Sequence, residues 1–260
     1  MTVPRVLITG ASAGLGLLFA QALAREGRDL VIVARREDRL TALAASLRAD
    51  HKVAVLSIAL DLAEADAPAR LFAAMAQEGI MIDTLINNAG FGALGGFGEM
   101  DGAMQAGMID LNCRALVMLC HLALPGMRAR GSGAILNLAS VAAFVPGPWM
   151  AVYYATKAFV LSFSEALHEE MKDSGIIVSA LCPGPTRTEF AQVAGMGSSP
   201  LFTTFAADAD GVVRDGLAAL KSGKAVKVSG VMNAMTTMVA GFMPRALVRV
   251  IAGRLQKTRT

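Results

Sequence analysis

Cysteine and charge are both scarce in this chain of 260 residues. The three cysteines, Cys113, Cys120 and Cys182, have spacings that fit neither a disulfide framework nor a metal site. The sequence therefore predicts a reducing compartment, and we expect a cytoplasmic protein. Charged residues make up 17% and the net charge is +3, which is too small and too dispersed to favour nucleic-acid binding. Residues 1–5 lead directly into an apolar run, without the pattern of a signal peptide.

Apolar residues are abundant, at 54% of the chain. That fraction is enough for a parallel sheet buried on both faces, and the length suits one large α/β domain over 1–260. Short apolar runs rich in β-branched residues alternate with helical segments. The alternation predicts a single-domain, doubly wound (Rossmann-like) seven-stranded parallel sheet with helices on both faces. The expected strands span 3–8, 30–34, 53–58, 84–86, 135–138, 176–181 and 225–228.

A glycine-rich turn, Thr9–Gly16, follows the first expected strand and precedes a helix over 17–26. Small residues let backbone N–H groups approach a pyrophosphate at the positive end of a helix, so this order indicates an anion site. Three residues separate Gly10 from Gly14, which differs from the G-x-G-x-x-G spacing. A tight turn alone also uses glycine, so the motif does not decide the function by itself.

Two arginines, Arg35 and Arg36, end the second expected strand. In a dinucleotide fold this position meets the adenosine ribose, where an acidic residue suits a 2′-hydroxyl and an arginine suits a 2′-phosphate. The alternative is a solvated helix start in which the arginines pair with Glu37 and Asp38. We favour the phosphate interpretation because of where the fold places the two side chains.

Other turns at strand ends have residues suited to a nucleotide. Asp61 could reach an adenine amino group or cap a helix that begins near Glu64. Asn87–Gly90 combines amide and small side chains, which allow close approach. Cys182–Thr188 is a rigid turn whose hydroxyls could hold a carboxamide or the pyrophosphate.

Tyr153 and Lys157 lie four residues apart in an expected helix over 150–171, so they project from one face. An ammonium beside a tyrosine favours the phenolate and lowers the tyrosine pKa from about 10 towards the working range. Tyr154 lacks such a partner, because Ala158 stands four residues later. The pair alone would mean little, but Ser140 ends the preceding strand and could converge on the same substrate oxygen.

Asn112 lies within an apolar helical region over 101–127. An asparagine in the middle of a helix usually faces solvent or bonds its own backbone. Because its neighbours are apolar, we expect Asn112 to have a specific role if its side chain faces inward.

Together these motifs resemble the short-chain dehydrogenase/reductase (SDR) family of the compact type, over residues 3 to about 190. The resemblance implies a nicotinamide cofactor and a tetrad in which Tyr153 exchanges the proton and Ser140 steadies the substrate oxygen. Lys157 would lower the Tyr153 pKa and hold the nicotinamide ribose, and a kink at Asn112 would order a water molecule. The implied cofactor-binding residues are Gly10, Ser12, Ala13, Gly14, Leu15, Gly16, Arg35, Arg36, Asp61, Leu62, Asn88, Ala89, Gly90, Tyr153, Lys157, Pro183, Gly184, Thr186 and Thr188.

The expected function is hydride transfer between NADP(H) and a hydrophobic ketone or secondary alcohol. Many relatives carry a basic residue at the position of Ala13, so the choice of NADP(H) over NAD(H) rests on Arg35 and Arg36. An acyl-chain (3-oxoacyl-type) reductase is an alternative. A nucleotide-sensing regulator is another, but it would need the glycine turn and not all four tetrad residues. The apolar residues around the 150–171 helix also predict a homodimer or homotetramer.

The last part of the chain has no recognisable motif. Residues 190–207 are expected to form a substrate lid, with Phe190, Met196 and Phe202 in an apolar pocket wall. Residues 229–260 are expected to be a helical extension, rich in methionine and then basic and amphipathic after Pro244. We favour a role in closing the pocket or contacting another subunit over binding to an anionic membrane surface.

Overall fold

Seven parallel strands form one sheet in the computed structural model, which describes residues 4–195 and 206–257. The strand order is β3-β2-β1-β4-β5-β6-β7. This confirms the doubly wound sheet predicted from the alternation of strands and helices. The strands are β1 Arg5–Thr9, β2 Leu30–Ala34, β3 Val55–Ala59, β4 Ile82–Asn87, β5 Gly133–Leu138, β6 Ile176–Cys182 and β7 Val226–Val228.

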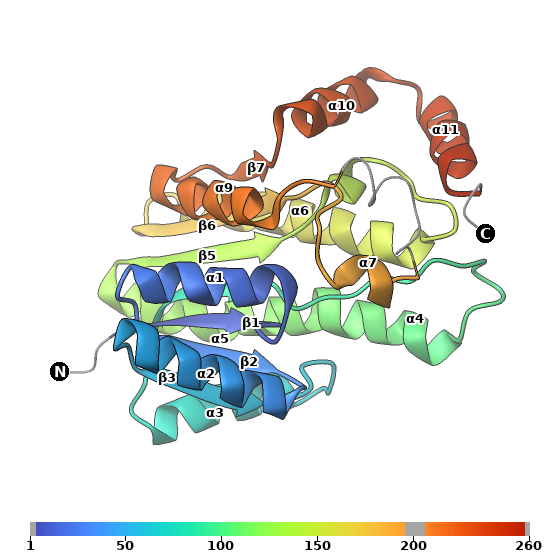
Figure 1. The fold of residues 1–260 in the computed structure, drawn as a ribbon. Coiled ribbons are helices and arrows are strands. Elements are labelled where there is room, and N and C mark those ends of the chain that lie inside the picture. Colours follow the sequence, from blue (N-terminus) through green and yellow to red (C-terminus); the bar gives the residue numbers. More distant parts are fainter. Residues whose placement is uncertain (1–3, 196–205, 258–260) are drawn as a thin grey trace.

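Helices cover both faces of the sheet (Figure 1). Alternate side chains of β1 show why: Val6 and Ile8 pack into one core cluster, and Leu7 into the other. Helices α1 (Gly14–Arg25), α2 (Glu37–His51) and α9 (Ala209–Ser222) contribute to the first cluster. The second is closed by α3 (Ala67–Gln77), α5 (Leu116–Arg130) and α6 (Ala151–Met171).

A long helical stretch crosses one face of the sheet and is interrupted by a π-helix. It consists of α4 (Gly102–Ile109), the π-helix η1 (Asp110–Ala115) and α5. The N-cap Asp101 accepts hydrogen bonds from two backbone N–H groups of α4, which fixes the start of the helix. The stretch is long and apolar enough to cross a membrane by length and composition alone. However, Leu119 and Met127 pack in the core beneath the sheet, which identifies it as a core helix.

The helix after β3 begins later than expected. It starts at Ala67 with a proline in its first turn, rather than near Glu64. Asp61 accepts a hydrogen bond from the Ala63 N–H, so its side chain holds a turn ahead of the helix and does not cap it. The sequence placed this boundary wrongly because a local turn competes with the helix.

The carboxyl ends of the strands converge on the crevice where the order of the strands reverses. The first strand, β1, lies between β2 and β4, so connections from β1 and β4 leave towards opposite sides of the sheet. In open α/β sheets this is where ligands bind. Shorter elements border it: the 3₁₀-helix η2 (Val141–Phe144) and α7 (Phe190–Val193). The chain ends in α10 (Val231–Phe242) and α11 (Arg245–Lys257).

Candidate active site

Tyr153, Lys157 and Ser140 meet at the carboxyl edge of the sheet, as the sequence predicted. Tyr153 and Lys157 are both buried on one face of α6, and the Lys157 Nζ lies 5.8 Å from the centroid of the Tyr153 ring. The same Nζ donates a 2.7 Å hydrogen bond to the Leu138 carbonyl at the end of β5. Ser140 follows that strand and hydrogen-bonds to Tyr153. Strand and helix therefore hold two hydroxyls and an ammonium around one point.

The sequence predicted that the Tyr153 pKa would be lowered, and this prediction is wrong for the structure. Burial raises the Tyr153 pKa above its ordinary value, and the hydrogen bond to Ser140 opposes that rise only in part. Burial likewise lowers the Lys157 pKa to about 8. Both shifts have one cause, because removing water disfavours the charged form of each group. With a pKa near 8 the Lys157 amine is still mostly protonated at neutral pH, so it retains the charge that favours a phenolate.

Asn112 points inward from the π-helix η1 and joins two parts of the site. Its Oδ1 accepts a 3.1 Å hydrogen bond from the Phe91 N–H, and its Nδ2 donates to the Phe91 carbonyl at 2.9 Å. The Nδ2 also donates to the Thr156 Oγ1, at 3.1 Å. Asn112 thus ties the loop after β4 to α6, which gives the buried amide a purpose. Single-turn π-helices within α-helices often mark functional sites.

Gly90 belongs to the same cluster. A Cβ atom at Gly90 would lie 2.9 Å from the Asn112 Oδ1 and 3.6 Å from the Lys157 Nζ. The absence of a side chain at this position therefore leaves room between the loop after β4 and α6.

The glycine turn has the geometry of an anion site. Gly10 and Gly14 have φ angles of +68° and +56°, which favour glycine, and a side chain at Gly16 would collide with the Gly10 carbonyl. The Asn88 Nδ2 donates to the Thr9 carbonyl at 2.9 Å, which fixes the turn against β4. The N-cap residue of α1 is Ala13, whose side chain accepts no hydrogen bond from the first N–H groups of the helix. The first N–H groups of the helix are thus suited to a pyrophosphate, and the residues present fit a dinucleotide.

Beside this turn runs a groove of about 330 Å³, and two of the residues that line it, Arg39 and Glu189, belong to an ion-pair cluster. The Arg36 Nε donates to the Ser12 Oγ at 3.2 Å, and its Nη1 lies 3.0 Å from Glu189. The Arg39 Nη1 lies 2.6 Å from the other oxygen of Glu189. Arg39 and Arg36 together lower the pKa of the Glu189 carboxyl. The groove is lined by Ser12, Ala13, Gly14, Leu17, Arg39, Ala42, Leu43 and Glu189.

The predicted arginine pair is therefore divided between two partners. Arg35 is largely exposed and lies 3.7 Å from Asp61, whereas Arg36 bonds Ser12 and Glu189, two of the residues that line the groove. The alternative pairing with Glu37 and Asp38 is not found among the described residues. Arg39 was missed in the sequence, although its position one helical turn after Arg36 in α2 was a usable signal.

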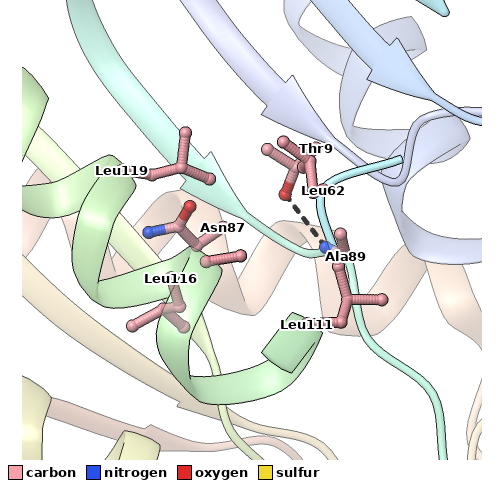
Figure 2. A pocket seen from close by; sticks show the side chains of 8 residues that line it. Thr9, Leu62, Asn87, Ala89, Leu111, Leu116 and Leu119 are labelled. Carbon is pink, nitrogen blue, oxygen red and sulfur yellow. Dashed lines mark hydrogen bonds between the residues drawn. The ribbon is translucent and has the colours of Figure 1, made fainter. Parts of the chain in front are cut away.

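A second, smaller cavity lies behind the turn after β4 (Figure 2). It measures about 10 Å³ and is lined mainly by apolar residues, with Thr9 and Asn87 as polar exceptions. The Thr9 Oγ1 accepts a 3.0 Å hydrogen bond from the Ala89 N–H. Leu62, a predicted cofactor residue, has its side chain buried here in the core. The volume suits one water molecule and excludes a nucleotide.

The turn after β6 uses its hydroxyls internally. The Thr186 Oγ1 donates to the Gly184 carbonyl at 2.9 Å, and the Thr188 Oγ1 accepts from the Phe190 N–H at 3.3 Å. Thr188 also faces the glycine turn, since a Cβ at Gly14 would lie 3.3 Å from it. The carbonyl of Pro183 accepts a 3.3 Å hydrogen bond from the Ser140 Oγ. This turn therefore borders both the glycine turn and Ser140.

The surroundings of Tyr153 are apolar. The Phe190 ring lies 5.5 Å from the Tyr153 ring, centroid to centroid, which places this predicted substrate residue at the site. Met196 and Phe202 lie outside the described residues. The other apolar side chains packed in the same cluster are Phe91, Ala93, Leu94, Met100, Met108, Ala142, Met150, Val152, Tyr154 and Ala194.

The chain is similar to several known proteins. Residues 4–197 match the family described as short chain dehydrogenase. The very-long-chain 3-oxoacyl-CoA reductase of Bos taurus is 33% identical over 72% of this chain. Sulfoacetaldehyde reductase 2 of Chromohalobacter salexigens is 38% identical, over 72% of this chain and 75% of its own length. The chain spans only 61% of the length of the bovine relative.

A solved structure matches nearly the whole chain. It is a short-chain dehydrogenase from Sphingobium yanoikuyae in complex with NADPH, which is 35% identical with a TM-score of 0.82. The match covers 94% of this chain and 97% of that one.

Proposed function

The chain belongs to the short-chain dehydrogenase/reductase family, and from this premise we propose that it transfers hydride between NADP(H) and a hydrophobic ketone or secondary alcohol. The observation that carries the proposal is the convergence of Ser140, Tyr153 and Lys157, with Asn112 fixing the adjoining loop. A nucleotide-sensing protein would need the glycine turn but would have no use for this arrangement.

The chemistry of the site follows from its own groups. A bound nicotinamide cofactor supplies or accepts the hydride. In reduction, the hydroxyls of Ser140 and Tyr153 bind the carbonyl oxygen, and Tyr153 donates its proton to the developing alkoxide. The Lys157 ammonium stabilises the phenolate that remains. In the oxidation direction the same steps run in reverse, and the Tyr153 phenolate accepts the hydroxyl proton of an alcohol.

NADP(H) is favoured over NAD(H) by the cations beside the glycine turn. Arg36 and Arg39 converge beside Ser12, at the side of the glycine turn where the adenosine ribose of a dinucleotide lies. A 2′-phosphate suits such a pair because guanidinium groups bind phosphate through charge-assisted, bidentate hydrogen bonds. The related Sphingobium protein, whose structure contains NADPH, supports the same assignment.

A hydrophobic substrate is favoured by the apolar cluster around Tyr153. A 3-oxoacyl thioester is the second candidate, supported by the bovine relative. The sulfoacetaldehyde reductase relative is named for a small, charged carbonyl compound, which contrasts with the apolar substrate proposed here. We further propose that the protein is a cytoplasmic homodimer or homotetramer, as its cysteines and the apolar surface of α6 suggest.

A substrate panel tests the proposal. Bulky apolar ketones, their secondary alcohols, 3-oxoacyl thioesters and sulfoacetaldehyde are assayed with NADPH, NADH and their oxidised forms. We expect the highest kcat/KM for an apolar carbonyl with NADPH, and its loss in Tyr153→Phe, which controls for contaminating reductases. Best turnover of sulfoacetaldehyde would contradict an apolar pocket. Tight nucleotide binding without turnover of any panel member would support the regulator instead.

A further inference from the structure

Helix α10 turns its apolar side outward. In the part of the chain that the structure describes, none of its residues is buried, and Val231 and Phe242 are 80% and 88% exposed. Residues 231, 235, 238 and 242 recur at the spacing of one helical face. The exposed apolar side chains of this face are Val231, Met232, Met235, Met238, Val239 and Phe242.

The opposite side of α10 faces the body of the protein and is small and polar. Asn233 packs against Gly184, and its Nδ2 donates a 2.7 Å hydrogen bond to the Ser229 carbonyl. Thr237, one turn later, bonds the Asn233 carbonyl at 3.0 Å. In a surface helix the apolar face normally packs on the core. Here the arrangement is reversed, so the methionines of α10 do not close the pocket, and the subunit contact that the sequence also predicted for this tail is not tested.

Helix α11 fastens this extension to the catalytic region. Val248 is buried, and the Gln256 Nε2 donates a 2.7 Å hydrogen bond to the hydroxyl of Tyr154, the neighbour of Tyr153. Its other side presents Leu247, Val250 and Ile251, which are 42–48% exposed. Figure 1 shows α10 and α11, in red, outside the layers that cover the sheet. We name the exposed apolar residues of both helices the tail surface.

The charge of this segment distinguishes between the occupants that could cover it. Residues 228–260 contain five basic residues, Arg245, Arg249, Arg254, Lys257 and Arg259, and no Asp or Glu. A two-fold contact between two tails would bring these cations together without a carboxylate of the same segment to pair with them. Arg245 and Arg249 are exposed on α11, and an anionic surface complements their charge and the exposed apolar side chains of the two helices.

We propose that the tail surface binds the surface of an anionic lipid bilayer, with α10 lying in the plane of the interface. Twelve residues of helix extend about 18 Å, too short to cross a hydrocarbon core of about 30 Å. Such a position suits the outward apolar face with arginines nearby. Because α10 packs against η2, next to Ser140, the bilayer would lie close to the active site. The inference itself does not depend on the proposed reaction.

Vesicle co-sedimentation of the full-length protein tests this inference. We expect sedimentation with vesicles of phosphatidylcholine and phosphatidylglycerol, weaker binding at high salt, and little binding to phosphatidylcholine alone. Met235→Glu combined with Met238→Glu should weaken binding at least about tenfold, because two apolar side chains would no longer be buried in the interface. Met81→Glu combined with Met104→Glu, which alters two exposed methionines elsewhere, should leave binding unchanged.

Circular dichroism and nucleotide titration show whether each variant is folded, independently of catalysis. The proposal is overturned if the wild-type protein binds neither kind of vesicle. It is also overturned if light scattering shows an oligomer that the tail variant dissociates and the control does not. A second copy of the chain would then be the occupant of the tail surface.

Discussion

The carboxylate of Glu189 lies 2.6 Å from the Nη1 of Arg39, joining the start of α7 to α2 across 150 residues of sequence. Its other oxygen lies 3.0 Å from Arg36. If these arginines bind a 2′-phosphate, Glu189 competes with it for the same donors. Because Glu189 directly precedes Phe190, the competition also connects the cofactor groove to the substrate side of the site.

Replacing Glu189 with glutamine should therefore strengthen binding of 2′,5′-ADP, since a neutral amide competes less for the guanidinium groups. The pair is partly exposed, so we expect a gain of only about two- to fivefold. Binding of 5′-AMP, which lacks the 2′-phosphate, should change little. Glu64→Gln, which breaks an exposed ion pair with Arg70 elsewhere, is the matched control for isothermal titration. Equal gains for both ligands would contradict a phosphate site.

Removing the cations should have the opposite effect. Arg35→Ala combined with Arg36→Ala, and separately Arg39→Ala, should weaken NADP(H) binding far more than NAD(H) binding. A charge-assisted hydrogen bond contributes about 1.5–3 kcal/mol, so roughly tenfold or more per arginine is expected. Fluorescence titration of both nucleotides measures the ratio. An unchanged preference would show that these arginines merely face solvent.

The two adjacent tyrosines should differ in their importance. Tyr153→Phe should abolish turnover and leave nucleotide binding nearly intact, because only the proton-exchanging hydroxyl is lost. Tyr154→Phe should retain most activity. It should nevertheless lower stability by about 1–3 kcal/mol, since the buried Gln256 loses its acceptor. Steady-state kinetics and denaturant unfolding measure the two effects. Comparable losses of activity would refute the assignment of Tyr153.

The lowered pKa of Lys157 predicts a specific dependence of stability on pH. Between its folded pKa of about 8 and the ordinary value of 10.5, the unfolded state binds more protons than the folded state. The free energy of unfolding should therefore rise with pH in this window. Tyr153 and the buried cysteines have raised pKa values, so their contributions have the opposite sign at higher pH.

Comparison with Lys157→Met isolates the lysine contribution. From about pH 7.5 to about pH 10, the stability of wild type relative to this variant should rise by on the order of 2–3 kcal/mol. Lys172→Met, which removes an exposed lysine just after α6, should show no comparable change. Denaturant unfolding at both pH values measures the difference. A flat profile for wild type relative to Lys157→Met would contradict the buried, destabilised ammonium.

The exposed part of α6 predicts association. Phe159 is 44% exposed and stacks on Phe163 with centroids 6.0 Å apart, whereas Leu161 and Leu167 are buried in the core. We expect Phe159→Asp to weaken a homo-oligomer, because it places a charge in an apolar contact. Phe97→Asp, at another exposed phenylalanine, is the control. Light scattering at micromolar concentration gives the mass. A monomeric wild type would remove this prediction.

The sequence by itself determined the sheet, and it predicted which residues form the candidate active site. Strands are recognisable because buried runs of β-branched residues alternate with helical segments. Tyr153 and Lys157 share a face because four residues make about one helical turn. Ser140 and Asn112 were predicted through the same family pattern, and the structure places both beside α6.

Only the tertiary structure decided how these groups behave. The pKa of Tyr153 depends on desolvation by segments far apart in sequence, so the local lysine spacing predicted its direction wrongly. The contact between Arg39 and Glu189 joins residues whose separation leaves no periodic signal. In α10 the methionine stripe predicted a buried face, but Asn233 packs against Gly184, so the polar side lies towards the body. Amphipathic spacing defines two faces of a helix, and only packing decides which of them is covered.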